Sequence, residues 1–323
     1  MRLATIRTRG TTAAVRIDDT EAVEIGYRDV GALLERPDWA ERAAEATGPH
    51  HDVAGLDHAP VVPRPGKIFC VGLNYRSHIS EMGREIPRYP ALFAKFPAVL
   101  IGAYDDIVLP AASEAVDWEG ELAVVVGARA RHVPVADAGR HIAGYAVLND
   151  VTARDWQYRS KEWLQGKIFE ATTPFGPYLV TADAAGDVRG RLRTEVDGET
   201  VQSADTGDLV VDPAHLISYL STIITLEPGD VIATGTPGGV GHARTPSRYL
   251  ADGNVLTTAV EGLGECRNRC VAESPMTPDL PSRTMLMHWL SEGTGRLLDA
   301  VDASATPASS AGPPCRAGRT RTC

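Results

Sequence analysis

The chain of 323 residues is long enough for one large domain, or for a main domain with a small appendage. Apolar residues make up 43% and charged residues 23%, which excludes a wholly disordered chain and a fibrous repeat. The 32 basic and 42 acidic side chains give a formal charge of −10. Nucleic acid and anionic membranes are therefore poor partners, and metal ions or polar metabolites are better ones.

The sequence gives no sign of export or of a membrane anchor. No run approaches the roughly 18 consecutive apolar residues of a spanning helix, and the first residues lack the apolar segment of a signal peptide. The odd number and irregular spacing of the five cysteines predict neither a disulfide framework nor a zinc site. We therefore expect a cytoplasmic protein.

The first part of the chain predicts a small N-terminal α/β domain over residues 1–62. Two alternating strands precede two helical stretches, at 13–17, 22–25, 29–34 and 39–46. The proline-rich segment 60–66 can continue neither a helix nor a central strand, so we expect a linker there.

Strand patterns dominate residues 67–273. Apolar or alternating runs occur at 67–72, 98–110, 121–130, 141–150, 174–181, 191–202, 230–237 and 254–273. The pair Asp197-Gly198 predicts a hairpin turn within one of these runs. Helical patterns are confined to 75–82, 152–163 and 213–224. Because strands and helices do not alternate regularly, we expect a β-rich, mixed α+β domain rather than a doubly wound sheet.

Acidic residues mark the start of one predicted strand. With a period of two, Asp117, Glu119 and Glu121 point to the same face, and Glu119 lies about 6.6 Å from Glu121 along the strand. Like charges stacked in this way repel one another unless the face is solvated or holds a cation. A solvated strand face and a cation site both remain open from this pattern alone.

A further acid, Asp150, ends an apolar strand just before a helix that Thr152 and Asp155 are expected to open as a capping box. A turn-forming aspartate is the plainer interpretation, but strand ends are also where functional loops gather. Together with the two glutamates, it would supply three oxygen ligands, a set that suits Mg²⁺, with Mn²⁺ or Ca²⁺ as alternatives.

Three other features can carry chemistry. His78 and Glu81 share a helix face, where a carboxylate would orient an imidazole as a general base or would form only a surface ion pair. Lys167 follows a glycine at a strand entrance and could face an anion, although without context a surface lysine is the plainer interpretation. The glycine-rich segment 234–241 lacks the ending of a P-loop. Its N–H groups and a hydroxyl suit a carboxylate or oxyanion, and turn-forming glycines are the alternative.

Taken together, these motifs resemble the fumarylacetoacetate hydrolase family from about Lys67 to Val271. The motifs that carry the resemblance occur in this order: VGLNYRSHISEMG, VDWEGELAVVVG, GYAVLNDVTARDWQ, the GK–TPFGPYLVT segment and TGTPGGVG. The leading segment also resembles the small N-terminal domain of bacterial members. The resemblance implies a β-roll core, a homodimer and a divalent cation held by acids.

Motif matching then implies a role for each candidate residue. The metal ligands would be Glu119, Glu121 and Asp150, and the general base would be His78 with Glu81 as its partner. The residues in substrate-contacting positions are Gln157, Lys167 and Thr236, of which Lys167 also stabilises developing negative charge. The sequence GKIFE departs from the GKSFD of many members at Ile168 and Glu170, which puts the details of the substrate pocket in doubt.

The resemblance implies an Mg²⁺-dependent hydrolase of carbon–carbon bonds in ketonic acids. We expect an acylpyruvate substrate, with cleavage of fumarylpyruvate to fumarate and pyruvate in the gentisate branch of aromatic catabolism favoured. The alternative is a decarboxylase or isomerase of the same family, acting on oxaloacetate or 2-hydroxyhepta-2,4-diene-1,7-dioate. The pair His78 and Glu81 favours hydrolysis because it can activate water. A non-catalytic metal-binding scaffold predicts loss of the base or the lysine, and neither is lost.

The segment 274–323 is rich in Ser, Pro, Ala and Arg, and its last twenty residues contain no Ile, Leu, Val, Met or aromatic residue. Such a composition predicts a poorly ordered, non-catalytic tail with at most one helix, over Thr284–Ala303. That helix is similar to the opening helix of mycothiol-dependent maleylpyruvate isomerases, which make fumarylpyruvate. We therefore hypothesise a read-through into a neighbouring isomerase gene, which is the main reason for favouring fumarylpyruvate.

Overall fold

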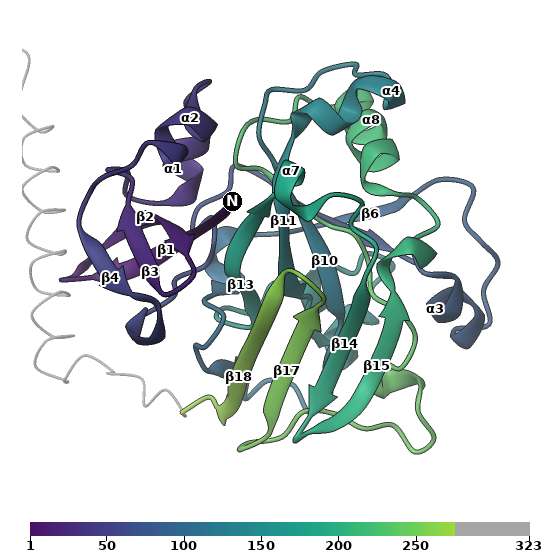
Figure 1. Ribbon diagram of the computed structural model, residues 1–323. Coiled ribbons are helices and arrows are strands. Elements are labelled where there is room, and N and C mark those ends of the chain that lie inside the picture. The colour runs from purple at the N-terminus through teal and green to yellow at the C-terminus, as the bar shows by residue number, and fades with distance from the viewer. Residues whose placement is uncertain (275–323) are drawn as a thin grey trace, which may run out of the picture. The chain divides into compact units, whose positions relative to one another are not determined.

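The computed structural model describes residues 1–274, which form one compact unit. The expected helix Thr284–Ala303 and the read-through hypothesis lie outside the described residues. Two β-sheets form most of the unit (Figure 1). The large sheet has eleven strands, ordered β4-β3-β2-β1-β13-β11-β10-β16-β5-β6 with β7 beside β13. The smaller sheet is ordered β15-β14-β17-β18-β8, and β9 pairs with β12.

The large sheet contains β1 (Arg2–Thr8), β2 (Thr11–Asp18), β3 (Glu21–Glu24), β4 (His50–Asp52), β5 (Ile68–Gly72), β6 (Ala91–Lys95), β7 (Leu100–Ile101), β10 (Gly120–Val126), β11 (Ile142–Asn149), β13 (Thr173–Thr181) and β16 (Val231–Ala233). The five-stranded sheet contains β8 (Ile107–Leu109), β14 (Arg191–Val196), β15 (Glu199–Asp205), β17 (Val255–Val260) and β18 (Gly264–Ala272). The remaining pair is β9 (Val116–Asp117) and β12 (Thr152–Ala153).

The helices are short and lie in the connections between strands. They are α1 (Val30–Leu34), α2 (Trp39–Ala44), α3 (Arg76–Glu81), α4 (Val135–Ala138), α5 (Arg154–Gln157), α6 (Leu164–Lys167), α7 (Ala182–Ala185) and α8 (Pro213–Ile223). Single 3₁₀ turns occur at Val53–Gly55, Pro97–Val99, Gly139–His141, Thr206–Asp208 and Gly241–Ala243. Among the described residues, no helix has the length and hydrophobicity that crossing a membrane requires.

Strand β10 is apolar from Leu122 onwards because both of its faces are buried. Leu122 and Val124 point into a core shared with α8 and the smaller sheet, whereas Ala123 and Val125 point into a core shared with the N-terminal strands and α1. Figure 1 shows β14, β15, β17 and β18 in front of β10, β11 and β13, with α8 above them. Strand β10, which contains Glu121 and directly follows Glu119, is therefore packed on both faces.

The N-terminal strands extend the sheet of the main body. Strand β1 pairs with β13 in antiparallel register, with Leu3 opposite Leu179, and the first four strands continue outward from it. The division into domains at 1–62 and 67–273 stays a prediction, since the two parts share one hydrogen-bonded sheet.

Local structure confirms some predictions and corrects others. Asp197 and Gly198 have φ angles of 54° and 81° between β14 and β15, as expected of a hairpin turn. The predicted helix over 152–163 is wrong: Thr152 lies in β12, and its hydroxyl donates to the carbonyl of Asp150 instead of capping a helix. Within that range the structure has β12 and the four-residue helix α5, and α6 begins after it, at Leu164.

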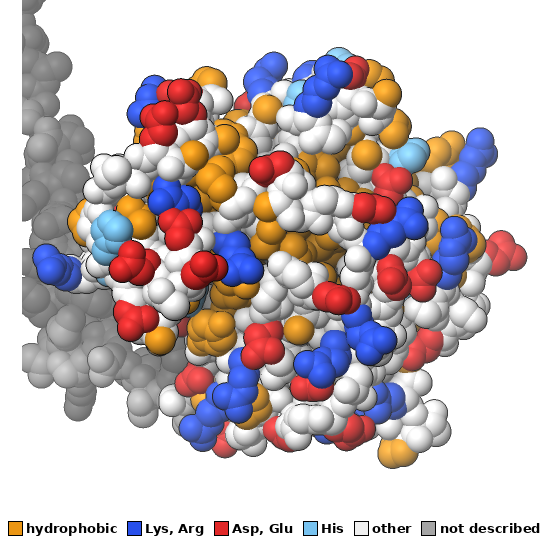
Figure 2. Space-filling model, viewed as in Figure 1, with side chains coloured by type: hydrophobic (Ala, Val, Ile, Leu, Met, Phe, Trp, Pro, Cys, Tyr) orange, Lys and Arg blue, Asp and Glu red, His pale blue; other side chains and the backbone are white. Residues whose placement is uncertain are grey.

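Charged side chains are interspersed on the face of the molecule that Figure 2 shows. Acidic and basic groups alternate over the five-stranded sheet and its surroundings without a field of one sign. The net charge of −10 is therefore not gathered on this face.

Candidate active site

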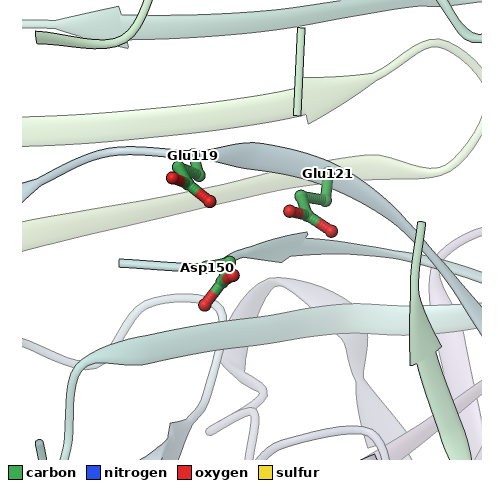
Figure 3. Close-up of side chains that lie close together, drawn as sticks. All are labelled: Glu119, Glu121 and Asp150. Atoms are coloured by element: carbon green, nitrogen blue, oxygen red, sulfur yellow. The ribbon is translucent and has the colours of Figure 1, made fainter. Parts of the chain in front are cut away.

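Three buried carboxylates meet where β10 and β11 lie side by side. Glu119 directly precedes β10, Glu121 lies at its start, and Asp150 follows the end of β11, directly across from them (Figure 3). Each offers an oxygen atom, and these atoms all lie within 4.8 Å of one another. Antiparallel pairing sets this arrangement, because Gly120 of β10 lies opposite Asn149 of β11.

Asp117 does not join this group, so the prediction that three acids share one strand face is wrong for it. The strand is interrupted at Trp118 and Glu119, and Asp117 belongs to β9. Its buried carboxylate accepts hydrogen bonds from Nε of Arg154 at 2.8 Å and from the N–H groups of Gly241 and His242 at 2.7 and 2.9 Å. Asp117 therefore ties the glycine-rich loop to α5.

Buried cations surround the carboxylates. Nζ of Lys167 donates to Oε2 of Glu119 and to Oδ2 of Asp150, both at 2.7 Å. Nζ of Lys95 donates to the other oxygen of Asp150 at 2.7 Å, and Nη1 of Arg154 lies 2.7 Å from Oε1 of Glu119. None of these five side chains is more than 7% exposed.

The two glutamates are left in different electrostatic states. Burial opposes the charge of Glu119, but the attraction of Lys167 and Arg154 lowers its pKa to about 2. Burial and the neighbouring carboxylates raise the pKa of Glu121 well above its usual range. The hydrogen bond that Glu121 receives from the described residues is the N–H of Gly235, at 2.7 Å. A divalent cation beside Glu121 would relieve this repulsion, and three oxygen ligands fit such an ion.

The glycine-rich loop supplies N–H groups to carboxylates of the chain itself. Gly235 and Gly239 have φ angles of 106° and 100°, which residues with a side chain rarely adopt. The N–H of Gly235 donates to Glu121, and that of Gly239 donates to both oxygens of Glu81 at 2.9 and 3.1 Å. The expected carboxylate partners of this loop are therefore the site's own acids.

His78 and Glu81 form a pair on α3, as their spacing predicts. Nδ1 of His78 lies 3.3 Å from Oε2 of Glu81, and His78 as a whole residue is 8% exposed. Although burial opposes its charge, the bonds from His78 and Gly239 lower the pKa of Glu81, which therefore stays ionised. An ionised carboxylate fixes the ring so that Nε2 is the nitrogen available to a ligand.

One pocket collects most of the candidate residues. It is lined by His78, Glu119, Glu121, Gln157, Lys167 and Thr236. Asp150 and Glu81 support this lining through their bonds to Lys167 and His78. Neither residue that departs from the family pattern lines this pocket: Ile168 packs against a core cluster and Glu170 is exposed.

Neighbouring groups orient the two polar residues with expected substrate contacts. Oε1 of Gln157 accepts a hydrogen bond from Nη1 of Arg154 at 3.0 Å. The hydroxyl of Thr236 donates to the carbonyl of Gly120 at 3.0 Å and accepts from Nε2 of Gln202 at 2.8 Å. Both side chains are therefore held in place before a ligand binds.

Sequence reasoning missed Lys95, Arg154, His242 and Gln202. Lys95 had a usable signal, because a lone lysine within the apolar run of residues 91–101 is rarely buried without a partner. Arg154 follows Asp150 by four residues and precedes Gln157 by three, yet only the tertiary structure places Asp117 beside it. Nothing local marks His242 or Gln202, since Asp117 and Thr236, to which they bond, lie far from them in the sequence.

Comparison with known proteins identifies relatives of the whole described unit. The family model described as "Fumarylacetoacetate (FAA) hydrolase C-terminal" matches residues 67–271, which confirms the resemblance found in the motifs. The human mitochondrial oxaloacetate tautomerase is 43% identical over 235 residues, covering 72% of this chain and 75% of that protein. Because this relative is named as mitochondrial, the cytoplasmic location expected here stays a prediction.

Solved structures confirm the fold class. The 5-carboxymethyl-2-hydroxymuconate delta-isomerase from Mycobacterium smegmatis has a TM-score of 0.72 and 33% identity, covering 84% of this chain and all of that one. The maleylpyruvate hydrolase from Sphingobium sp. SYK-6, solved with manganese(II) and pyruvate, has a TM-score of 0.70 and 27% identity, covering 85% of this chain and all of that one. The mixed β-rich fold is therefore shared with enzymes of isomerase and hydrolase type.

Proposed function

The chain belongs to the fumarylacetoacetate hydrolase family, and from that premise we propose that it is a metal-dependent tautomerase of short 2-oxo dicarboxylic acids such as oxaloacetate. The observation that carries the proposal is the joining of His78, Lys167 and the metal-type carboxylates around one pocket. Tautomerisation of a 2-oxo acid moves a proton between carbon and oxygen, and it needs an acid–base group and positive charge beside the oxygen.

The relatives support tautomerisation as the first candidate reaction and acylpyruvate hydrolysis as the second. The motifs favoured acylpyruvate hydrolysis, with isomerisation or decarboxylation of 2-oxo acids as the alternative. An oxaloacetate tautomerase at 43% identity and an isomerase among the solved structures support the alternative. Fumarylpyruvate hydrolysis and a place in gentisate breakdown have no such support.

We assign the metal to Glu119, Glu121 and Asp150, with Mg²⁺ or Mn²⁺ as the ion. The manganese of the Sphingobium hydrolase supports a divalent cation in this family. A cation held here would act as a Lewis acid towards the oxygen atoms of a 2-oxo acid. A homodimer, as the resemblance implies, stays part of the proposal.

The protein's own groups would carry the proton and balance the charge. With Nδ1 directed at Glu81, Nε2 of His78 would exchange a proton with carbon 3 of the substrate. Burial opposes the charge of Lys167, but Asp150 and Glu119 raise its pKa, so the ammonium stays protonated where negative charge develops on the substrate oxygen. The enol loses its O–H proton and carbon 3 gains one, so no other reactant is needed.

Hydrolysis of an acylpyruvate is the second candidate, and a specific observation favours it. The bonded pair of His78 and Glu81 could equally take a proton from water. A neighbour named maleylpyruvate hydrolase has the same fold. The two reactions differ in their products, because hydrolysis releases pyruvate and tautomerisation keeps the carbon skeleton intact.

A substrate panel separates these reactions. The protein with Mg²⁺ or Mn²⁺ would be given the enol form of oxaloacetate, acetylpyruvate and fumarylpyruvate, with absorbance and product analysis as the readouts. Faster ketonisation of oxaloacetate without release of pyruvate supports the proposal. Turnover of the acylpyruvates alone, with pyruvate as product, would replace it with the second candidate.

A further inference from the structure

One buried carboxylate holds an arginine and a histidine at the same pocket. Oδ2 of Asp117 accepts from Nε of Arg154 at 2.8 Å and from the backbone N–H of His242 at 2.9 Å. Its other oxygen accepts from the N–H of Gly241 at 2.7 Å, and the side chain of Asp117 is fully buried. Arg154 and His242 both line the pocket of the candidate active site. Asp117, which does not line the pocket itself, therefore fixes the position of Arg154 relative to the backbone of His242.

The guanidinium of Arg154 keeps one nitrogen without a partner. Nε is bound to Asp117, and Nη1 contacts both Glu119 at 2.7 Å and Gln157 at 3.0 Å. Nη2 is buried and has no hydrogen-bond partner among the described residues, while the side chain is only 5% exposed. A buried donor left unpaired is costly, so this nitrogen favours a ligand that brings an acceptor.

His242 adds a ring to the same part of the wall. Its Nδ1 lies 3.0 Å from the hydroxyl of Tyr249, and the imidazole packs against the ring of Tyr158 with centroids 5.3 Å apart. Burial, together with the charge of Arg154, lowers the pKa of His242, so the ring is neutral near pH 7. If the hydroxyl of Tyr249 donates to Nδ1, the proton of the neutral ring sits on Nε2, which then becomes a donor.

We propose that Nη2 of Arg154 and Nε2 of His242 form a subsite for the second carboxylate of a 2-oxo dicarboxylic substrate. This inference rests on the proposed function and specifies its substrate class. The 2-oxo acid end of the substrate would face the metal that Glu119, Glu121 and Asp150 would hold, and the subsite would receive the carboxylate at the other end. Arginine suits this role because its planar fork matches a carboxylate.

The charge of the site supports a dianionic substrate. Four buried carboxylates face three buried cations here: Asp117, Glu119, Glu121 and Asp150 against Lys95, Arg154 and Lys167. A divalent cation would turn this net charge of minus one into plus one. A substrate with two carboxylates then meets a positive site, and the unpaired nitrogen of Arg154 is where the second charge is satisfied.

The test compares two substrates that differ only in the distal charge. Ketonisation of the enol forms of oxaloacetate and of its 4-methyl ester would be measured with Mg²⁺ in the wild type and in His242→Ala. We expect kcat/KM for the diacid to fall about ten- to hundredfold, the worth of a hydrogen bond to a charged group, and the ester to change little. His215→Ala, at an exposed histidine paired with Asp212 outside the pocket, is the matched control.

Two further variants separate contact from positioning. Arg154→Lys keeps a charge beside Asp117 but loses the fork, so the preference for diacid over ester should shrink. Because Nη1 of Arg154 also contacts Glu119, both substrates would be compared at saturating Mg²⁺. Tyr249→Phe frees the tautomer of His242 and should shrink the preference by a smaller factor. Equal losses on both substrates, or an unchanged preference in all three variants, would overturn the subsite and leave Nη2 to a water molecule.

Binding provides a readout that does not depend on catalysis. Calorimetry with Mg²⁺ would compare malate with malate 4-methyl ester, and His242→Ala should weaken only malate. A wild-type protein that accelerates neither enol refutes the proposed function, but a malate preference lost in His242→Ala would still support the subsite. Active protein that binds both malates equally refutes the subsite alone.

Discussion

The two ends of the pocket are built in different ways. The carboxylate end is formed by residues of β6, β10 and α6 and by Asp150, which follows β11. Asp150 and Lys95 are fully buried there and form an ion pair with each other. The acid–base end lies on α3, where Glu81 is 27% exposed and reaches His78 through a single 3.3 Å contact. Substitutions at the first end should change both folding and chemistry, whereas those at the second should change chemistry alone.

The two glutamates of the carboxylate end provide the largest contrast. Glu121→Gln and Glu119→Gln should both abolish metal-dependent turnover, because each removes a charged ligand. Only Glu119→Gln should also unfold more easily, by about 1–3 kcal/mol, since Lys167 and Arg154 lose their shared carboxylate but keep Asp150 and Asp117. Glu121→Gln relieves repulsion and should be at least as stable as the wild type without metal.

Urea denaturation in the presence of a chelator would check the stabilities, and calorimetric titration with Mn²⁺ would check the binding. Equal stability of the two variants would contradict the distinction between the glutamates. Full metal affinity in either one would remove it from the ligand set.

The acid–base end can be broken without disturbing the metal. His78→Asn should slow turnover by roughly 10²–10⁴, the contribution of a general acid–base group, with metal affinity and stability unchanged. His215→Asn is the matched control, because His215 also has a carboxylate partner three residues away but lies outside the pocket. Steady-state kinetics that show the same loss in both variants would place the effect outside the active site.

Lys95 tests whether metal binding depends on the buried groups that hold the proposed ligands in place. Lys95→Met leaves one oxygen of Asp150 without its buried partner and should weaken metal binding about 10- to 100-fold, as loss of groups that orient ligands does. Lys67→Met is the control, because it removes a 2.7 Å ion pair between Lys67 and Asp230. The Lys67 side chain is 25% exposed and does not line the pocket of the candidate active site. A metal affinity in Lys95→Met equal to that of the control would show that Asp150 needs no such support.

We expect the smallest effect on activity from the glycine-rich loop, whose N–H groups bond to Glu121 at the carboxylate end and to Glu81 at the acid–base end. In Gly239→Ala the new Cβ would lie 2.2 Å from the carbonyl oxygen of Val201, at a φ of 100°. We expect a loss of stability of about 1–3 kcal/mol and a modest loss of activity, because the N–H that holds Glu81 must move. Gly262→Ala shares the positive φ without a close contact, and denaturation of both variants isolates the collision.

The sequence predicted what is local and missed what depends on distant pairing. Strand periodicity placed Glu119 beside Glu121, and helical spacing placed His78 beside Glu81, because the members of each pair are only two or three residues apart in the sequence. Pairing of β10 with β11 brings Asp150 to them, which the motif resemblance implied and local patterns could not.

Errors arose where tertiary contacts overrode a local signal. The capping pattern at Thr152 failed because its hydroxyl bonds to Asp150 instead. Asp117 does not lie beside Glu119 and Glu121, because the strand is interrupted after it and its carboxylate accepts a hydrogen bond from Arg154. The contacts of Lys95 with Asp150 and of His242 with Asp117 join residues far apart in the chain, so no local pattern marks them.

The most direct test of the central claim is a stopped-flow measurement of the ketonisation of enol-oxaloacetate by the metal-stripped protein, before and after addition of Mg²⁺ or Mn²⁺. Product analysis would accompany each trace, with Glu121→Gln as the inactive reference. The account predicts acceleration that requires the metal, is absent in the variant, and leaves the four-carbon acid intact. Acceleration without metal, or release of pyruvate in step with the loss of absorbance, would contradict it.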